Sequence, residues 1–330
     1  MDIRKLLWEA ARVGNKRAMP ILSFPAAQKL GVSVETLVKS AELQAQAMEV
    51  VARETDTLAA VSLMDLSVEA EAFGAHVRFS ENEVPAIHGQ LVCDEDEANA
   101  LAVPELTAGR ALLCVEAVRT AKTRIMDKPV LAGMIGPYSL AGRLMDVTEI
   151  MYLCYDEPET VHTVLDKAAQ YLIRYGRAMK DAGADGIMMA EPLAGILSPD
   201  MAQEFSMPYV RRIIDALQDE DFAVIYHNCG NAVPRMLEGI YGLGAAAYHF
   251  GNAVDMAAIL AKTPSDVLVM GNIDPAGEFA GGTVESITAA TKALLEKCGG
   301  YPNFVPSSGC DIPAHAKWEN IAAFFAAVKG

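Results

Sequence analysis

One histidine and two cysteines of this sequence have a spacing that suits a zinc site. His227 and Cys229 follow the apolar run Phe222–Tyr226, and Cys310 follows a second apolar run, Asn303–Val305. Runs of this kind predict β-strands. In an extended chain alternate side chains face the same way, so His227 and Cys229 point to one side. One histidine and two cysteines form a three-ligand set for zinc that leaves a fourth position open for chemistry.

The charge of such a site predicts what it does. Zn²⁺ with one neutral histidine and two thiolates is a net-neutral centre, which holds a substrate thiol as a thiolate near pH 7, below its usual pKa of about 8.5. A site of three neutral histidines is more electrophilic and better at activating water. The set His227, Cys229 and Cys310 therefore favours alkyl transfer to sulfur over hydrolysis. The alternative is a core histidine with two buried thiols, since cysteine is among the most buried residue types.

Length and composition narrow the class of protein. The chain has 330 residues, 52% of them hydrophobic, and a formal net charge of −16. So acidic a chain gains nothing from counterion release, which argues against nucleic acid as a partner and, more weakly, against anionic membranes. The N-terminus lacks the apolar core of a signal peptide, and no apolar run approaches the roughly 20 residues that span a bilayer. With six scattered cysteines, a reduced, cytoplasmic setting is expected.

Predicted strands alternate with predicted helices along most of the chain, which indicates a parallel sheet covered by helices. Because unusual residues follow many different strands, the pattern favours a (β/α)8 TIM barrel in a single domain, 1–330, with a helical extension over 1–55 and a small β-hairpin within 77–92. The eighth strand is unclear and is sought within 77–103. The predicted strands are Leu58–Met64, Val130–Ile135, Gly186–Ala190, Phe222–Tyr226, Ala245–Phe250, Asp266–Gly271 and Asn303–Val305, and the predicted helices include 33–51 and Asp200–Leu217.

Other polar residues at strand ends are candidates for the site. Glu191, among apolar neighbours, is expected to have a raised pKa and to transfer protons. Asp65 and Glu69 lie one helical turn apart: either they stabilise a helix N-terminus, or they face substrate or cofactor at the barrel mouth. Asn252, Asn272 and Asp274 are expected to contact the substrate or the metal ligands.

The motif His227-x-Cys229, taken with 307–313 (SSGCDIP), resembles the zinc motif of methylcobamide:coenzyme M methyltransferases, which belong to the uroporphyrinogen decarboxylase superfamily. Similar stretches occur at 64–74, 136–140, 191–192 and 197–199. The resemblance implies a (β/α)8 barrel in which zinc, held by His227, Cys229 and Cys310, activates a thiol. The thiol takes a methyl group from a methylcorrinoid carried by a partner corrinoid protein. It also implies cofactor contacts at Gly136, Tyr138 and Ser308.

Two departures from the family pattern leave alternatives open. Uroporphyrinogen decarboxylases carry arginines that grip substrate carboxylates, whereas 21–28 here reads ILSFPAAQ. Where the methyltransferases have a carboxylate after the next strand, this chain has His249. As a site residue, His249 is either a fourth zinc ligand or a contact of a ligand. The alternatives are that His249 is a plain core residue, that Glu191 is the fourth ligand, or that the fourth position stays open for water or thiol. The acceptor is coenzyme M, another thiol or tetrahydrofolate. The alternatives to a methyltransferase are a decarboxylase of a tetrapyrrole or other carboxylate, and a non-catalytic corrinoid-binding accessory protein.

Overall fold

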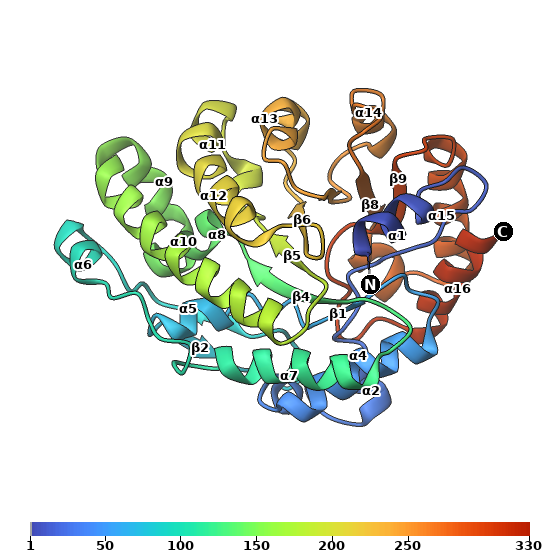
Figure 1. Cartoon of the computed structure of the whole chain (residues 1–330), viewed down its shortest axis with the longest axis horizontal. Helices are drawn as coiled ribbons and strands as arrows, with labels where there is room; N and C mark the ends of the chain where they lie inside the picture. The colour runs from blue at the N-terminus through green and yellow to red at the C-terminus, as the bar shows by residue number, and fades with distance from the viewer. Residues whose placement is uncertain (1) are drawn as a thin grey trace.

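The computed structural model describes residues 2–330 and is built around one curled parallel sheet (Figure 1). This sheet has seven strands in the order β1-β4-β5-β6-β7-β8-β9, all pairing in parallel, and helices lie around it. The predicted α/β barrel class is confirmed. The strands are β1 (Ala60–Val61), β4 (Val130–Ile135), β5 (Gly186–Ala190), β6 (Ala223–Asn228), β7 (Ala247–Phe250), β8 (Val269–Ile273) and β9 (Phe304–Ser308).

Residues 18–22, near the N-terminus, bridge the two edge strands of this sheet. The amide of Met19 donates to the Pro306 carbonyl of β9 at 3.1 Å, and the Leu58 amide, just before β1, donates to the Ala18 carbonyl at 2.9 Å. An extended N-terminal segment thus occupies the position of an eighth strand. Its hydrogen bonds satisfy edge groups of β9 that would otherwise be unpaired.

The expectation of an eighth barrel strand within 77–103 is wrong. This region forms the separate antiparallel hairpin of β2 (His76–Arg78) and β3 (Ala86–His88), followed by α6 (Glu95–Ala100). None of the residues in β2 and β3 is fully buried, whereas a parallel strand is covered on both faces. The hairpin itself was correctly predicted.

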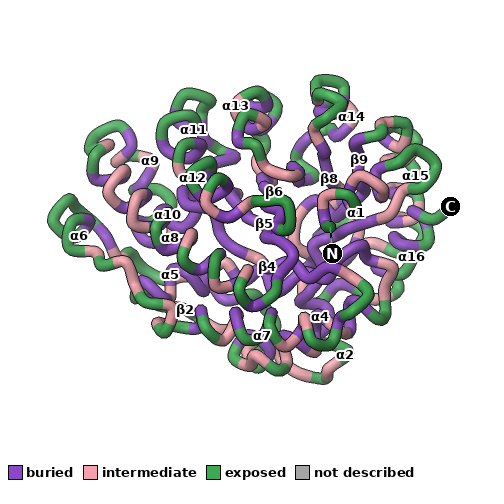
Figure 2. The backbone as a smooth tube through the Cα atoms, in the orientation of Figure 1, coloured by how far each residue is buried: buried purple, intermediate pink, exposed green. Residues whose placement is uncertain are grey.

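The interior of the barrel is a packed apolar core. Side chains from strands, including Val61, Met188, Ile225 and Val305, form one buried cluster with Leu7 and other residues of α1 (Ile3–Ala10). In Figure 2 the strands of the parallel sheet are almost entirely buried, whereas exposed residues lie mainly on the surrounding helices and loops. The apolar core and α1 fill the barrel interior. A site is therefore expected at the mouth of the barrel, where the polar side chains at the carboxyl ends of the strands lie.

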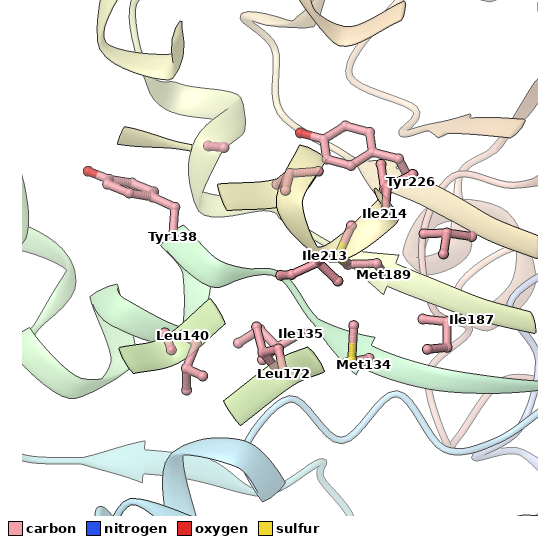
Figure 3. Packing of buried hydrophobic residues seen from close by; sticks show 14 of the residues in the cluster. Met134, Ile135, Tyr138, Leu140, Leu172, Ile187, Met189, Ile213, Ile214 and Tyr226 are labelled. Atoms are coloured by element: carbon pink, nitrogen blue, oxygen red, sulfur yellow. The ribbon is translucent and has the colours of Figure 1, made fainter. Parts of the chain in front are cut away.

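A second apolar layer packs between the outer faces of the strands and the helices. Figure 3 shows part of it, where Met134 of β4 and Met189 of β5 lie among side chains such as Leu172 and Ile213. The helices are α2 (Ala26–Leu30), α3 (Val34–Val38), α4 (Ala41–Glu54), α5 (Val68–Ala72), α7 (Ala111–Arg124), α8 (Pro137–Met145), α9 (Val147–Asp156), α10 (Pro158–Asp181), α11 (Pro199–Phe205), α12 (Met207–Leu217), α13 (Leu237–Tyr241), α14 (Met256–Leu260), α15 (Val284–Cys298) and α16 (Trp318–Lys329), with short helical turns η1 (Leu193–Ile196), η2 (Val233–Arg235) and η3 (Pro275–Ala280).

Two predicted helices are each divided in the structure. The predicted helix over 33–51 is α3 followed by α4, because Ser40 caps a new helix: its Oγ accepts from the Leu43 amide at 3.3 Å. Such a cap has extended backbone and interrupts helical periodicity. The predicted helix Asp200–Leu217 breaks at Ser206, and Pro208 lies in the first turn of α12, where its missing N–H costs nothing. Within 2–330, no helix is long and apolar enough to cross a membrane.

Candidate metal centre

His227, Cys229 and Cys310 come together at the carboxyl ends of β6 and β9. Each offers one donor atom, and the three atoms lie within 4.8 Å of one another. The Nε2 atom of His227 is 3.5 Å from Cys310 Sγ. Zinc bonds of about 2.3 Å to sulfur and about 2.0–2.1 Å to nitrogen, at the tetrahedral angle, place two such donors about 3.5 Å apart. The three side chains therefore fit a zinc ion.

Strand register sets the direction of His227. It is the fifth residue of β6 and lies one residue beyond Tyr226, where the predicted strand ended. Its side chain is on the same face as those of the interior residues Ala223 and Ile225. It pairs with Ala190 of β5 on one side and with His249 of β7 on the other. Because paired residues of parallel strands share a face, both imidazoles project into the mouth of the barrel.

Two close backbone approaches hold the cysteine loops in place. A Cβ atom on Gly251 would lie 2.6 Å from Cα and Cβ of Cys229, and a Cβ on Gly309 would lie 2.6 Å from Asn252 Oδ1. Only glycine allows these contacts. The loop after β7 is thus packed against Cys229 on one side and against the residue preceding Cys310 on the other.

The three donors differ in their access to solvent. The His227 side chain is 2% exposed, whereas both cysteines are partly exposed. The imidazole is thus fixed within the barrel, whereas each cysteine residue keeps some surface in contact with solvent.

The two thiols share a proton unequally. The hydrogen bond from the Cys310 thiol lowers the pKa of Cys229, and His227 lowers it further, although burial acts in the opposite direction. The same hydrogen bond, together with burial, raises the pKa of Cys310. A thiolate at Cys229 is the form that binds a metal ion.

His249 lies behind His227 and is not one of the three clustered donors. Its Nδ1 is 2.8 Å from His227 Nδ1, and its Nε2 is 2.7 Å from the Oγ of Ser307. Both ring nitrogens are therefore engaged, and the residue is fully buried. Of the two roles expected for His249, this geometry fits contact with a ligand better than direct ligation. Burial lowers the pKa of His249 well below its ordinary value.

Glu191 is fully buried and faces the N-terminus of α8. Its carboxylate accepts from the amides of Tyr138 at 2.7 Å and Ser139 at 2.9 Å, and from Ser206 Oγ at 3.2 Å. A Cβ on Gly136 would lie 2.3 Å from Glu191 Oε2, so the carboxylate lies directly against this backbone. Burial raises the pKa of Glu191 to about 7, although these hydrogen bonds oppose the rise. Its proton-transfer role remains a prediction.

Asp65 and Glu69 have buried partners of their own. Asp65 accepts from Arg110 Nη1 and, at 2.6 Å, from the hydroxyl of Ser67. Glu69 accepts from the Ile135 amide at 3.0 Å through one oxygen, and burial raises its pKa to about 7. Arg110 thus engages one carboxylate oxygen of Asp65 and Ser67 the other, and the catalytic role of Asp65 remains a prediction. Arg110 also binds Glu71 at 2.7 Å. The sequence did not predict this role, because Arg110 lies just before a helix and is 45 residues from Asp65 in the chain.

The remaining predicted contacts are spread around the barrel. Tyr138 is buried in the apolar layer outside the strands, where its hydroxyl donates to Met151 Sδ at 3.2 Å (Figure 3). Ser308 Oγ accepts from the Ile21 amide at 3.0 Å. Asn252, Asn272 and Asp274 line one surface cavity of about 390 Å³ with residues of α15, and none of the three metal donors lines it.

A family model described as uroporphyrinogen decarboxylase (URO-D) matches residues 15–330. The chain belongs to this family. It is 28% identical over 306 residues to a uroporphyrinogen decarboxylase from Psychromonas ingrahamii, covering 89% of this chain and 84% of the relative. It is 27% identical over 256 residues to methylcobamide:CoM methyltransferase MtbA from Methanosarcina acetivorans, covering 75% and 72%. The resemblance drawn from the zinc motif is confirmed.

Solved structures show the same fold. A methyltransferase from Methanosarcina mazei superimposes with a TM-score of 0.87 at 24% identity, covering 99% of this chain and 97% of that one. A B12-independent methionine synthase from Shewanella sp. W3-18-1 superimposes with a TM-score of 0.62 at 14% identity, covering 94% of both chains. Relatives in sequence include enzymes of two activities, decarboxylation and methyl transfer, so similarity alone does not choose between them.

The raised pKa of Glu191 predicts a measurable pH dependence of stability. Because its pKa is about 7 in the folded protein and ordinarily 4.5, the folded state binds the proton more tightly. The stability that this proton confers is present below pH 4.5 and is lost as pH rises through 7. Between pH 5 and 7, urea unfolding should show the wild-type stability falling by about 1.4 kcal/mol per pH unit more than that of Glu191→Gln.

The control is Glu220→Gln, at an exposed carboxylate on the surface. It should follow the wild-type pH dependence. Parallel curves for wild type and Glu191→Gln would contradict the raised pKa.

Proposed function

We propose that this chain is a zinc-dependent methyltransferase. It moves a methyl group from a methylated corrinoid, presented by a corrinoid protein, to an acceptor thiol. The observation that carries this proposal is the cluster of His227, Cys229 and Cys310, whose donor atoms lie within 4.8 Å of one another and whose two cysteine residues are partly exposed. A relative of the chain is named for this activity, methylcobamide:CoM methyltransferase.

The donor types select the chemistry. Zinc bound by one imidazole and two thiolates would hold an incoming thiol as a nucleophilic thiolate near neutral pH. The protein's part is to fix the donors: β6 orients His227, and the close approach of Gly251, in the loop after β7, fixes Cys229. Because both cysteine residues are partly exposed, we expect the acceptor and the corrinoid protein to approach from their side of the cluster.

The transfer is an in-line displacement. The acceptor sulfur forms a bond to the methyl carbon while the bond from carbon to Co(III) breaks, and both electrons of that bond leave with cobalt as Co(I). The acceptor thiol would lose its proton to solvent on binding zinc, before the attack. Holding sulfur and methyl carbon at attack distance in a shielded barrel mouth supplies much of the rate enhancement.

Decarboxylation is the second candidate, since the chain is equally similar to uroporphyrinogen decarboxylases. That reaction needs cationic groups for the substrate carboxylates. Arg110 is buried near the ends of β1 and β4, but its guanidinium already binds Asp65, Glu71 and Ser67. Residues 21–28 contain no arginine. The donor cluster is therefore better explained by methyl transfer.

The first test is metal content. Protein purified under reducing conditions should hold about one zinc ion per chain, and Cys229→Ala or Cys310→Ala should lose it, because each removes a donor. Mass spectrometry of the metal and circular dichroism of the fold are the measurements. Cys93→Ala, at an exposed thiol outside the cluster, is the matched control and should keep its zinc. Wild-type protein that binds no zinc would overturn the proposal.

The second test is methyl transfer from free methylcobalamin. Wild-type protein should methylate at least one member of a thiol panel that includes coenzyme M, with Co(I) formation followed by absorbance. Removing zinc, or Cys310→Ala, should lower the rate by at least about 100-fold, since the thiolate is no longer held. Tetrahydrofolate in place of a thiol identifies the other acceptor class. Decarboxylation of uroporphyrinogen without methyl transfer to any acceptor would favour the second candidate.

A further inference from the structure

A line of buried hydrogen bonds runs from the N-terminal segment to the candidate metal ligand. It begins at the backbone carbonyl of Met19, which accepts from Ser307 Oγ at 2.7 Å. Ser307 Oγ is 2.7 Å from His249 Nε2, and His249 Nδ1 is 2.8 Å from His227 Nδ1. The opposite nitrogen of the His227 ring, Nε2, faces the sulfur of Cys310. All three side chains of the line are buried.

The first bond fixes the direction of the second. A carbonyl oxygen only accepts hydrogen bonds, so the one hydroxyl proton of Ser307 is committed to Met19. Toward His249 the Ser307 oxygen can then only accept. The donor in that bond must be the Nε2–H of His249.

The same logic carries through the two rings. A neutral imidazole has one N–H donor and one bare acceptor nitrogen. His249 is fully buried, and its nearest titratable neighbour is another imidazole rather than a carboxylate, so burial favours the neutral ring. With its proton on Nε2, His249 accepts at Nδ1, and the donor of the last bond is the Nδ1–H of His227.

An independent contact requires the same proton position. The backbone carbonyl oxygen of His249 lies 3.3 Å from His227 Nδ1. This oxygen also can only accept, so it too calls for a proton on Nδ1 of His227. Two acceptors from His249, one in the ring and one in the backbone, thus converge on one N–H.

We propose that Ser307 and His249 are positioning residues that hold His227 in the tautomer protonated at Nδ1, with the lone pair of Nε2 free for the metal. This inference rests on the proposed function, because it concerns the same three-donor site. It assigns His249 the task of presenting a ligand, in the place where a fourth ligand was sought. A second consequence is that the segment closing the barrel, through the Met19 carbonyl, also prepares the site for zinc.

The reverse direction of these hydrogen bonds is less favourable. If His227 carried its proton on Nε2, its bare Nδ1 would face the bare His249 carbonyl oxygen at 3.3 Å. His249 would then have to donate from Nδ1 and accept at Nε2, and Ser307 would have to withdraw its proton from Met19. That would leave a buried carbonyl without this hydrogen bond, at a cost of about 1–3 kcal/mol.

The test combines tautomer assignment with zinc affinity. In zinc-free wild-type protein above pH 7, side-chain ¹⁵N NMR of labelled histidine should find a proton on Nδ1 of His227, and His249 protonated at Nε2 alone. This measurement needs no mutation, and a merely structural role would not set its result. Finding Nδ1 of His227 without a proton, or His249 protonated at Nδ1, would overturn the inference.

Zinc affinity, measured by competition with a chromophoric chelator, gives the second reading. Ser307→Ala should weaken zinc binding by about 10- to 100-fold, the usual effect of losing such an outer partner. The matched control is Ser62→Ala, which removes another buried serine hydroxyl and its bond to the Gly133 amide but touches neither histidine. It should bind zinc as the wild type does.

The outcomes separate the two proposals. Equal zinc affinity in Ser307→Ala and Ser62→Ala would overturn the role of Ser307 and His249, while zinc binding by wild type would leave the proposed function standing. A wild-type protein that binds no zinc would overturn the proposed function. In that case the tautomers in the zinc-free protein would still decide whether the hydrogen bonds run in the proposed direction.

Discussion

The candidate metal centre depends on the curling of the sheet. His227 lies in β6, and Cys310 follows β9, with β7 and β8 between them in the sheet order. In a flat sheet three strand intervals of about 4.8 Å would separate them by about 14 Å. The Nε2 and Sγ atoms are instead 3.5 Å apart. Anything that opens the sheet therefore separates the donors, and the site exists only while the barrel is closed.

Closure in turn depends on a segment far from the strands in sequence. Residues 18–22 hydrogen-bond to both β9 and the chain leading into β1. The same segment supplies the Met19 carbonyl at the start of the hydrogen bonds that reach His227. Architecture and ligand orientation are thus coupled through backbone groups, which no pattern of side chains in the sequence reveals. This coupling makes the site rigid. Because hydrogen bonds hold Nδ1 of the buried His227 ring, Nε2 can point in only one direction.

Much of the fold follows from the sequence because parallel strands are short apolar runs between helical segments. The strands Val130–Ile135 and Gly186–Ala190 have the predicted bounds. Closure by residues 18–22 was missed because that segment is held by pairing partners 288 residues away. Local patterning could not distinguish it from a loop. The eighth strand was wrongly sought in the region of the polar hairpin. The polar residues of this region already argued against a buried strand.

For the site, too, the sequence predicts some features and not others. The His-x-Cys spacing and the strand ends were enough to bring His227, Cys229 and Cys310 together. The environment of Asp65 was not predictable, because its partner Arg110 reaches it only through tertiary packing. His249 was singled out as a departure from the family pattern, but its contact with Ser307 depends on the strand order β7-β8-β9. Which residues gather can be predicted from strand ends, whereas which atom faces which requires the folded chain.

The central claim is that three protein donors hold zinc and leave one position for an acceptor thiol. X-ray absorption at the zinc edge tests it directly, with the loaded protein measured alone and after addition of the thiol that it methylates. We predict two sulfurs at about 2.3 Å and one imidazole nitrogen at about 2.0–2.1 Å from zinc, with a third sulfur appearing when the thiol is added. A site with two imidazoles and two sulfurs that does not change on adding thiol would contradict the account.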